Sequence, residues 1–427
     1  MKILLVNTYD IGGAANACLR LHQGLLGFSV NSKVLLRYKT KKISQTTAFH
    51  ALPVKLSLFK KIKNKTIKIL KELKILKSNK KSLEDRFISK RNKDLELYSF
   101  PKSQLDIMEN AAYQEADIVN LHWVANFLDY KSFFENNKKP VVWTLHDMNP
   151  FTGGEHYLEE FLGIDDNGFP LKRKLSKEEL AVEKGNRDIK RQALSNVSNL
   201  TIVAPSEWLA NEASKTELFS VLKVVCIPNG VEATIFSPRD KEYSRKLLNI
   251  PTGKKVILFV ADSISNNRKG FVFLKRAFEQ LKDDNVILCA IGHKNKELES
   301  DNNIMELGPV YDERLMSVIY SAADVFVIPS LMDNLPNTVL ESLMCGTPVI
   351  GFPVGGILDM IQHGKNGLLT KDISVNSLLE SLEEFLKGDI VFDVNMIRVN
   401  AVQKYDLKVQ AAEYKKLFES ILESNTK

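Results

Sequence analysis

Short runs of apolar residues alternate along the chain with stretches that have helical periodicity. The first run is residues 3–6, and a helical pattern with Ala17, Leu21 and Leu25 follows it. Further runs, each ending in polar or turn-forming residues, lie at 118–121, 141–145 and 201–204. Short apolar strands separated by helices are typical of a parallel sheet covered by helices on both faces. The first half of the chain is therefore predicted to be an α/β domain.

A second series of the same kind begins after a linker. The linker is predicted at residues 228–238, which are rich in turn formers. Four further apolar runs follow at 256–260, 286–291, 325–328 and 348–352, and a last helix is expected over about 407–422. Ligands of open parallel sheets bind beyond the carboxyl ends of the strands. Two such domains facing each other would enclose a cleft lined by the polar residues that follow the strands.

Composition narrows the class of protein. The chain has 427 residues, of which 44% are hydrophobic and 26% charged, values of a soluble globular protein with two or three domains. A mainly disordered chain, a collagen and a small disulfide scaffold are excluded. The cysteines are at least 56 residues apart, so a CxxC zinc or redox motif is excluded. They are expected to be reduced thiols.

The apolar runs are also too short for a targeting or spanning segment. The N-terminal run has four residues, fewer than a signal peptide needs, and 18 consecutive apolar residues occur nowhere. A cytoplasmic protein is expected.

Positive charge is concentrated in residues 55–81. This segment holds eleven lysines and one acid, Glu72, whereas the whole chain carries +7. Most of its apolar side chains fall on one face of a helical wheel, which favours a basic amphipathic helix lying on an anionic membrane surface at the inner face of the cell membrane. A helix packed on the protein with a solvated lysine face is the alternative. Nucleic-acid binding is not expected, because no reader motif accompanies the charge.

The most informative local pattern lies between Ser330 and Glu341. An apolar strand ends just before it, and Pro336 stands where a helix would begin, a position that suits proline. The free N–H groups of a first helical turn form an anion site. Asp333 and Glu341 could address different parts of one ligand lying across the helix start. Alternatively, Asp333 only favours the helix dipole and Glu341 is solvated.

At this point the chain resembles a known family. The pair Asp333-x7-Glu341 is similar to the E-x7-E motif of the retaining glycosyltransferases of family 4, which have the GT-B fold. The segments VFVIPS and LESLMCGTPVIGFPVGGILDMI around it agree, as do DIGGAA, ADIVNLHW and TLHDMNPFTGGEHY in the first half. The resemblance is strongest to bacterial members that build surface polysaccharides, and it covers roughly residues 1–50 and 111–369.

The resemblance implies an architecture. Two Rossmann-like domains, an acceptor-binding one over 1–232 and a nucleotide-sugar-binding one over 233–402, would face each other across a cleft. Residues 403–427 would form a helix that crosses back onto the first domain.

The resemblance also implies roles for residues of the second half. Glu341 would bind the ribose hydroxyls of a nucleotide, and Asp333, one methylene shorter than the usual Glu, would contact hydroxyls of the donor sugar. The backbone N–H groups of Leu335, Asn337 and Thr338 would meet the distal phosphate. Lys269 would pair with the leaving diphosphate, although a solvated basic turn is the alternative. Many members carry an arginine where this chain has Ser263, so Arg268 is expected to supply the second cation.

In the first half, His146 would orient a donor-sugar hydroxyl, whereas a lone histidine is more often structural. His122 and Asp147 are expected on the acceptor side. Gly12 and Gly13 would let the backbone approach the donor. The G-x-G-x-x-G fingerprint and the Walker P-loop are lacking, so NAD and ATP hydrolysis are not expected. No cofactor and no metal are expected, because cationic groups would stabilise the leaving phosphate.

The sequence thus predicts a retaining glycosyltransferase that moves a sugar from a nucleoside diphosphate sugar to a lipid-linked or surface-glycan acceptor. A nucleotide-sugar epimerase on the same fold and a non-catalytic glycan- or lipid-binding protein remain alternatives.

Overall fold

The computed structural model describes residues 1–49, 82–92, 95–293 and 303–425. The basic segment 55–81, for which membrane binding stays a prediction, lies outside the described residues. Within the described ranges, no helix combines the length and the apolar character needed to cross a bilayer.

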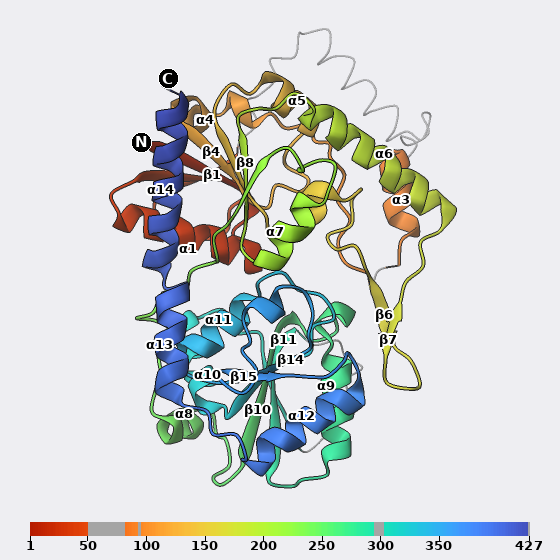
Figure 1. Cartoon of the computed structure of the whole chain (residues 1–427), viewed down its shortest axis with the longest axis vertical. Helices are drawn as coiled ribbons and strands as arrows, with labels where there is room; N and C mark the ends of the chain where they lie inside the picture. The colour runs from red at the N-terminus through yellow and green to blue at the C-terminus, as the bar shows by residue number, and fades with distance from the viewer. Residues whose placement is uncertain (50–81, 93–94, 294–302, 426–427) are drawn as a thin grey trace, which may run out of the picture.

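Two parallel sheets form the framework of the molecule (Figure 1). The first sheet has the strand order β3-β2-β1-β4-β5-β8-β9. Its strands are β1 (Lys2–Tyr9), β2 (Asn31–Tyr38), β3 (Thr46–Ala48), β4 (Ile118–Leu121), β5 (Val141–Thr144), β8 (Leu200–Ala204) and β9 (Lys223–Cys226). The second sheet has the order β12-β11-β10-β13-β14-β15. Its strands are β10 (Lys255–Ser263), β11 (Val286–His293), β12 (Ile304–Gly308), β13 (Val325–Ile328), β14 (Val349–Gly351) and β15 (Gly367–Leu369).

Helices cover both faces of each sheet, as the all-parallel strand pairing requires (Figure 1). In the first domain they are α1 (Gly13–Gly27), α3 (Leu83–Lys90), α4 (Ala111–Glu115), α5 (Tyr130–Asn136), α6 (Lys177–Leu194) and α7 (Glu207–Ser214). In the second they are α8 (Lys241–Leu247), α9 (Phe271–Leu281), α10 (Glu313–Ala322), α11 (Asn337–Met344), α12 (Val375–Lys387) and α13 (Val394–Tyr405). Single turns of 3-10 helix are η1 (Ile107–Glu109), η2 (Asn149–Phe151), η3 (Asn267–Lys269) and η4 (Gly355–Asp359).

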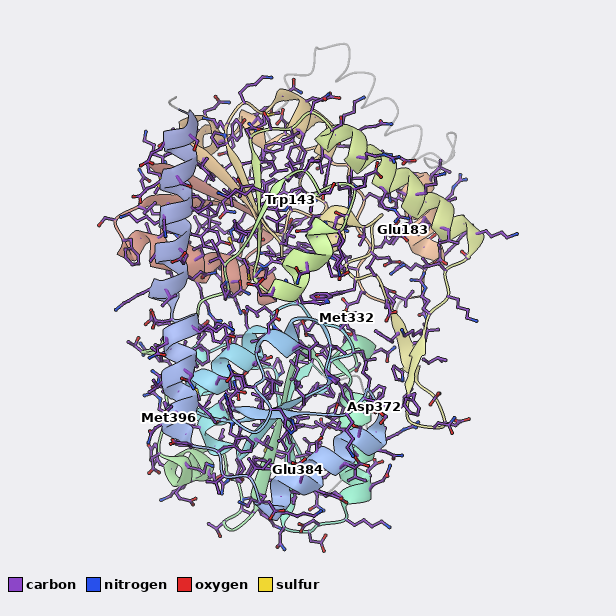
Figure 2. All side chains as sticks on the ribbon, in the orientation of Figure 1. Trp143, Glu183, Met332, Asp372, Glu384 and Met396 are labelled. Carbon is purple, nitrogen blue, oxygen red and sulfur yellow. The ribbon has the colours of Figure 1, made fainter. Side chains whose placement is uncertain are left out.

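Each domain has its own core. The central strand β1 is buried on both faces along six successive residues, which is why its sequence is apolar without alternation. One face of its sheet is filled by Trp143 and its neighbours, and the other by side chains of α1 and the last helix, α14 (Leu407–Asn425). Met332 packs against the cores of both domains, and Figure 2 shows it at the junction between them.

The predicted fold class is confirmed: two Rossmann-like parallel-sheet domains make up the chain. The apolar runs named from the sequence are strands in the structure. Sequence inspection missed β2, whose three central apolar residues are flanked by Lys33 and Arg37, and β15, which has only three residues.

It also missed an antiparallel hairpin, β6 (Phe161–Ile164) and β7 (Pro170–Lys172), that reaches from the first domain to the second. Phe161 is buried in the core of the second domain. At the tip, the Val375 N–H donates to the Gly168 carbonyl at 3.0 Å. The hairpin is therefore a strap between the domains.

Apart from this hairpin, the described part of the chain passes between the domains near Val231 and again near Asp406. The backbone of Val231 donates to Tyr405 and accepts from Leu407, at 2.9 and 3.0 Å. There α13 ends and α14 begins, at the predicted start of the last helix. The helix α14 crosses and packs against α1 of the first domain (Figure 1), and the Tyr414 and Thr144 hydroxyls share a hydrogen bond of 2.8 Å.

The contact between α1 and α14 requires a glycine at residue 24. A Cβ there would stand 2.8 Å from Ala411 Cβ and 3.2 Å from the Leu407 carbonyl oxygen. Gly24→Ala should lower the free energy of unfolding by about 1–3 kcal/mol, because the helices must move apart. Gly27→Ala in the same helix is the matched control, since its Cβ would meet nothing within 4 Å. Urea denaturation measures both, and equal stability of the two variants would contradict the prediction.

Candidate active site

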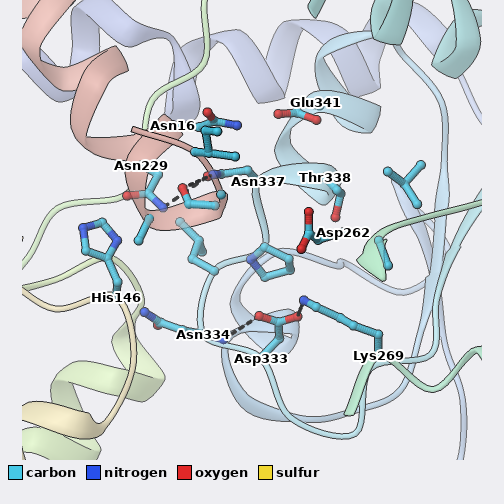
Figure 3. A pocket seen from close by; sticks show the side chains of 18 of the residues that line it. Asn16, His146, Asn229, Asp262, Lys269, Asp333, Asn334, Asn337, Thr338 and Glu341 are labelled. Carbon is cyan, nitrogen blue, oxygen red and sulfur yellow. Dashed lines mark hydrogen bonds and ion pairs between the residues drawn. The ribbon is translucent and has the colours of Figure 1, made fainter. Parts of the chain in front are cut away.

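A cleft of about 660 Å³ lies between the two domains, at the carboxyl ends of both sheets. The first domain contributes the loop after β1, one face of α1, and His146. The second contributes the end of β10, the turn η3 and the segment that joins β13 to α11. Figure 3 shows His146 and Asn229 on one side and Asp333, Lys269 and Glu341 on the other. Of the predicted site residues, only His122 is not among those lining this cleft.

The segment before α11 forms the floor of the cleft. Pro336 is the N-cap of α11, so the N–H groups of Asn337 and Thr338 lie in the first turn, where a helix has no backbone acceptors for them. The Asn337 side chain donates to the Gly13 carbonyl at 3.0 Å and accepts from Asn229 at 3.3 Å. The helix start is thus joined to the glycine loop of the opposite domain.

Three glycines hold this segment by close backbone contact. Gly356 donates its N–H to the Asp333 carbonyl at 3.1 Å, and a Cβ on Gly356 would lie 1.6 Å from the Asn334 carbonyl oxygen. Gly355 has a φ of 52°, and its Cβ would lie 2.1 Å from the Asp333 oxygen. On the other side, Gly270, with a φ of 71°, would place a Cβ 1.8 Å from the Pro329 carbonyl oxygen. Any side chain at these positions would displace the segment carrying Asp333.

Asp333 and Lys269 form an ion pair in the cleft, 2.6 Å between Oδ2 and Nζ (Figure 3). The same carboxylate accepts from the Ser330 hydroxyl at 3.2 Å, and Arg268 Nη1 lies 3.5 Å away. Burial disfavours the charged carboxylate, but Lys269 and Arg268 overcome it and hold the pKa of Asp333 below its usual value. The two residues that the sequence assigned to sugar and diphosphate are therefore direct partners.

Arg268 is fixed by a residue of the first domain. Its Nε donates to Glu96 at 2.7 Å, its Nη1 donates to the Met332 carbonyl at 2.9 Å, and its guanidinium lies 4.7 Å from the centre of the Tyr157 ring. Although burial opposes ionisation, Arg268 lowers the pKa of Glu96 to about 2. This arginine is therefore clamped between Glu96 and Asp333, with its planar face on Tyr157.

Glu341 is also paired across the cleft. Its Oε1 accepts from Nη2 of Arg20, on α1, at 2.7 Å, and its Oε2 accepts from the Tyr320 hydroxyl at 3.1 Å. Arg20 makes two further bonds to Glu313, from Nη2 at 2.7 Å and Nε at 3.1 Å. Burial raises the pKa of Glu341, and the charge of Arg20 opposes that rise.

His146 and His122 are a buried imidazole pair. His146 Nε2 and His122 Nδ1 are 2.9 Å apart, so the ring N–H of one donates to the other. Burial lowers the pKa of His146 to about 4 and that of His122 well below its ordinary value. Both rings are consequently neutral at physiological pH, and only His146 faces the main cleft.

Asp147 also lines the cleft, but its carboxylate already accepts hydrogen bonds from other groups of the protein. Oδ2 accepts from the Trp123 indole at 2.8 Å and contacts His156 Nδ1 at 2.5 Å, while Oδ1 accepts from the Asn149 N–H. His156 Nε2 lies 2.9 Å from the hydroxyl of Ser99. This serine–histidine–aspartate chain is not a hydrolase triad, because Ser99 is 1% exposed and lies outside the cleft lining. It holds Trp123 and His156 at the cleft wall.

The glycine loop is open toward the cleft. Gly12 has a φ of 100° and is the N-cap of α1, and a Cβ on Gly12 or Gly13 would meet nothing within 4 Å. Preceding it, the Asp10 carboxylate accepts from the N–H groups of Thr40 and Lys41, both at 2.6 Å. The loop is therefore anchored at its base and leaves its glycine backbone accessible.

Among the residues of this site that sequence inspection missed are Arg20, Glu96, Tyr157 and Glu313. Arg20 carried a signal, because it interrupts the apolar stretch of α1 one helical turn after Asn16 and one before Gln23, which both line the cleft. The sequence around Glu96 gave no such signal, since Glu96 lies in an irregular segment.

Comparison with known proteins shows which proteins this chain is similar to. The model of the family described as "Glycosyl transferases group 1" matches residues 254–388, which contain Lys269, Asp333 and Glu341. The match lies within the second domain, which is therefore similar to the group 1 glycosyltransferases.

Curated relatives match part of the chain. The D-inositol 3-phosphate glycosyltransferase of Thermobispora bispora is 28% identical over 182 residues, covering 38% of this chain and 42% of the relative. A putative teichuronic acid biosynthesis glycosyltransferase of Bacillus subtilis is 29% identical over 189 residues, covering 43% and 46%. The chain spans about half the length of the curated relatives it matches.

Solved structures match the whole GT-B framework. Sucrose-phosphate synthase from Thermosynechococcus elongatus superposes with a TM-score of 0.67 at 15% identity, over 99% of this chain and 100% of that one. HepE of Anabaena, in complex with UDP and glucose, superposes with a TM-score of 0.63 at 16% identity, over 98% and 100%.

Because the two buried imidazoles are neutral in the folded state, the free energy of unfolding should depend on pH. A histidine with a pKa of about 4 in the folded state and about 6.5 in the unfolded state contributes stability that is present above pH 6.5 and lost as the pH falls toward 4. The loss is about 1.4 kcal/mol per pH unit for each proton taken up by the unfolded chain. His146→Gln should therefore flatten the fall in unfolding free energy between pH 6.5 and 4.5. Denaturant titrations at several pH values measure the slope, and an unchanged slope would show that His146 is not held neutral.

Proposed function

We propose that this protein is a retaining glycosyltransferase of the family 4 type, which transfers a sugar from a nucleoside diphosphate sugar to a lipid-linked or surface-glycan acceptor. The observation that carries the proposal is the arrangement of Lys269, Asp333 and Glu341 around the start of α11, in a cleft between two Rossmann-like domains. The group 1 match over this domain supports it. Structural neighbours are described as complexes with UDP and UDP-glucose, which supports a nucleotide sugar as donor.

Each part of a nucleotide sugar then has a counterpart in the cleft. Glu341 accepts hydrogen bonds from ribose hydroxyls. Lys269, Arg268 and the first-turn N–H groups of α11 stabilise the negative charge that develops on the leaving phosphate. Asp333 contacts hydroxyls of the sugar, and the neutral imidazole of His146 hydrogen-bonds to it from the opposite wall. The acceptor enters along the first domain, near Trp123 and Asp147.

The transfer keeps the configuration of the anomeric carbon. The bond from that carbon to the phosphate oxygen breaks, and a bond to the acceptor oxygen forms on the same face. The proton of the acceptor hydroxyl passes to an oxygen of the leaving phosphate. Asp333 lies in an ion pair with Lys269 rather than opposite a second carboxylate, so a glycosidase-type acid and nucleophile pair is not part of this proposal.

The proposal is tested first by donor binding. A panel of nucleoside diphosphate sugars is screened for an increase in melting temperature, since a ligand that binds only the folded state stabilises it by mass action. The best donor is then incubated with extracts of glycolipid and glycan acceptors, and release of nucleoside diphosphate is measured. Conversion of the donor sugar without an acceptor would instead identify an epimerase. A rise in melting temperature without any turnover would identify a binding protein.

Two substitutions separate the roles of the site residues. Lys269→Ala should lower turnover by a factor that corresponds to about 2–4 kcal/mol in the transition state, while folding is preserved. Glu341→Ala should mainly weaken nucleotide binding. Lys275→Ala is the matched control, because this lysine pairs only weakly with Glu279 on α9 and lies outside the cleft lining. Unchanged kinetics in the first two variants, with intact melting curves, would remove this donor site.

Catalysis is expected to need no divalent ion. Lys269, Arg268 and the α11 N–H groups already supply positive charge where the diphosphate would leave. Activity should therefore survive dialysis against EDTA, as measured by nucleoside diphosphate release. If activity disappeared and returned only on adding Mg²⁺ or Mn²⁺, the cationic-clamp proposal would be wrong.

A further inference from the structure

Arg20 is a buried cation that the proposed mechanism leaves unused. It projects from α1 of the first domain across the cleft to α10 and α11 of the second, and it is 4% exposed. Its guanidinium stands 5.3 Å from the ring centre of Phe236, which covers its apolar face. Asn16, Leu19, Arg20 and Gln23 form the face of α1 that lines the cleft. The position of Arg20 is therefore part of the cleft wall.

The hydrogen bonds of Arg20 use only part of its guanidinium. Nε and Nη2 donate to Glu313, and Nη2 also donates to Glu341. Nη1 is buried and has no hydrogen-bond partner among the described residues. Buried polar atoms of native proteins are normally paired, so such an atom in a ligand cleft calls for a ligand oxygen. Because the fork of N–H groups is rigid, pairing Nη2 with Glu341 places Nη1 beside that carboxylate.

A donor and an acceptor held side by side match the chemistry of a sugar hydroxyl. A hydroxyl group donates one hydrogen bond and accepts others. If a ribose hydroxyl donates to Glu341, its oxygen is left to accept from a neighbouring N–H. A carboxylate alone can only accept, so it would leave the hydroxyl oxygen without a donor.

We propose that Arg20 is a nucleotide-positioning residue, whose Nη1 donates to the oxygen of the ribose hydroxyl that donates to Glu341. The inference rests on the proposed function, which places the ribose at Glu341. It adds that the first domain, and not only the nucleotide-binding second domain, recognises the ribose. Ribose recognition therefore requires the two domains to be together.

The test compares ribose and deoxyribose nucleotides. UDP, GDP, ADP and CDP are titrated against the wild-type protein by calorimetry, and the tightest binder is compared with its 2′-deoxy and 3′-deoxy forms. Loss of a charge-assisted hydrogen bond weakens binding about 10- to 100-fold. In wild type, one deoxy form loses its contacts with both Glu341 and Arg20 and should bind more weakly by about 100-fold or more. In Arg20→Lys the ratio should fall about tenfold yet stay above one, because Glu341 still accepts.

Arg20→Lys keeps a positive charge opposite Glu341 and Glu313, so folding should be preserved, and a melting curve checks this. Arg20→Ala is examined in parallel and is used only where it melts as a folded protein. Asp359→Asn is the matched control: Asp359 accepts from the Trp208 N–H across the domain junction at 3.0 Å but does not line the cleft. It should leave the ribose-to-deoxyribose ratio unchanged.

The outcomes are distinguishable. A lower ratio in the Arg20 variants alone supports the proposal. If ribose and deoxyribose forms weaken equally in those variants, Arg20 only ties the domains together and the proposal is overturned. If the wild-type protein binds none of the four nucleotides, the proposed function fails before this inference is reached.

Discussion

Charge buried at the junction of two domains must be paired, and this constraint organises the whole cleft. Placing an isolated ion in a low-dielectric site is strongly unfavourable, and removing one partner of a buried pair leaves the other uncompensated. Three of the pairs here take one member from each domain: Arg20 with Glu341, Arg20 with Glu313, and Arg268 with Glu96. The relative placement of the domains is therefore coupled to the electrostatics of the cleft. Separating the domains would leave these five charged groups without these partners at once.

The pair of Lys269 and Asp333 lies within the second domain and has a different character. Lys269 and Asp333 are held by the turn η3 and by the segment before α11, whose backbones contact Gly270, Gly355 and Gly356 at distances that exclude a Cβ. This part of the site is rigid by construction, because backbone atoms cannot move aside as side chains can. A diphosphate that reaches Lys269 would find the ammonium already paired and oriented. Binding would exchange one anion for another, with little reorganisation of the cation.

The sequence predicted those features that depend on residues close to one another in the chain. Short apolar runs identified the strands. Lys269 and Asp333 stood out because each follows a strand within a turn, and Glu341 because it stands eight positions after Asp333, inside the helix. Arg20 and Glu96 could not be assigned in this way, since their partners lie 321 and 172 residues away in the chain. The glycines of residues 355–356 were visible as part of a motif. Their physical reason, contact with the backbone of Asp333 and Asn334, exists only in three dimensions.

The site is divided between the two domains, and this division affects how the site would become complete. The second domain supplies a preformed half: the cations of Lys269 and Arg268, the carboxylates of Asp333 and Glu341, and the start of α11. The first domain supplies Arg20, Glu96 and His146, which reach that half only while the strap β6–β7 and the crossing at Val231 keep the domains in contact. In the proposed reaction, a nucleotide bound to the second domain alone would lack the groups that orient its sugar and ribose. In that reaction the donor would be oriented only when both walls are present, which is also when the closed cleft excludes water. The paired charges at the junction would hold the walls together.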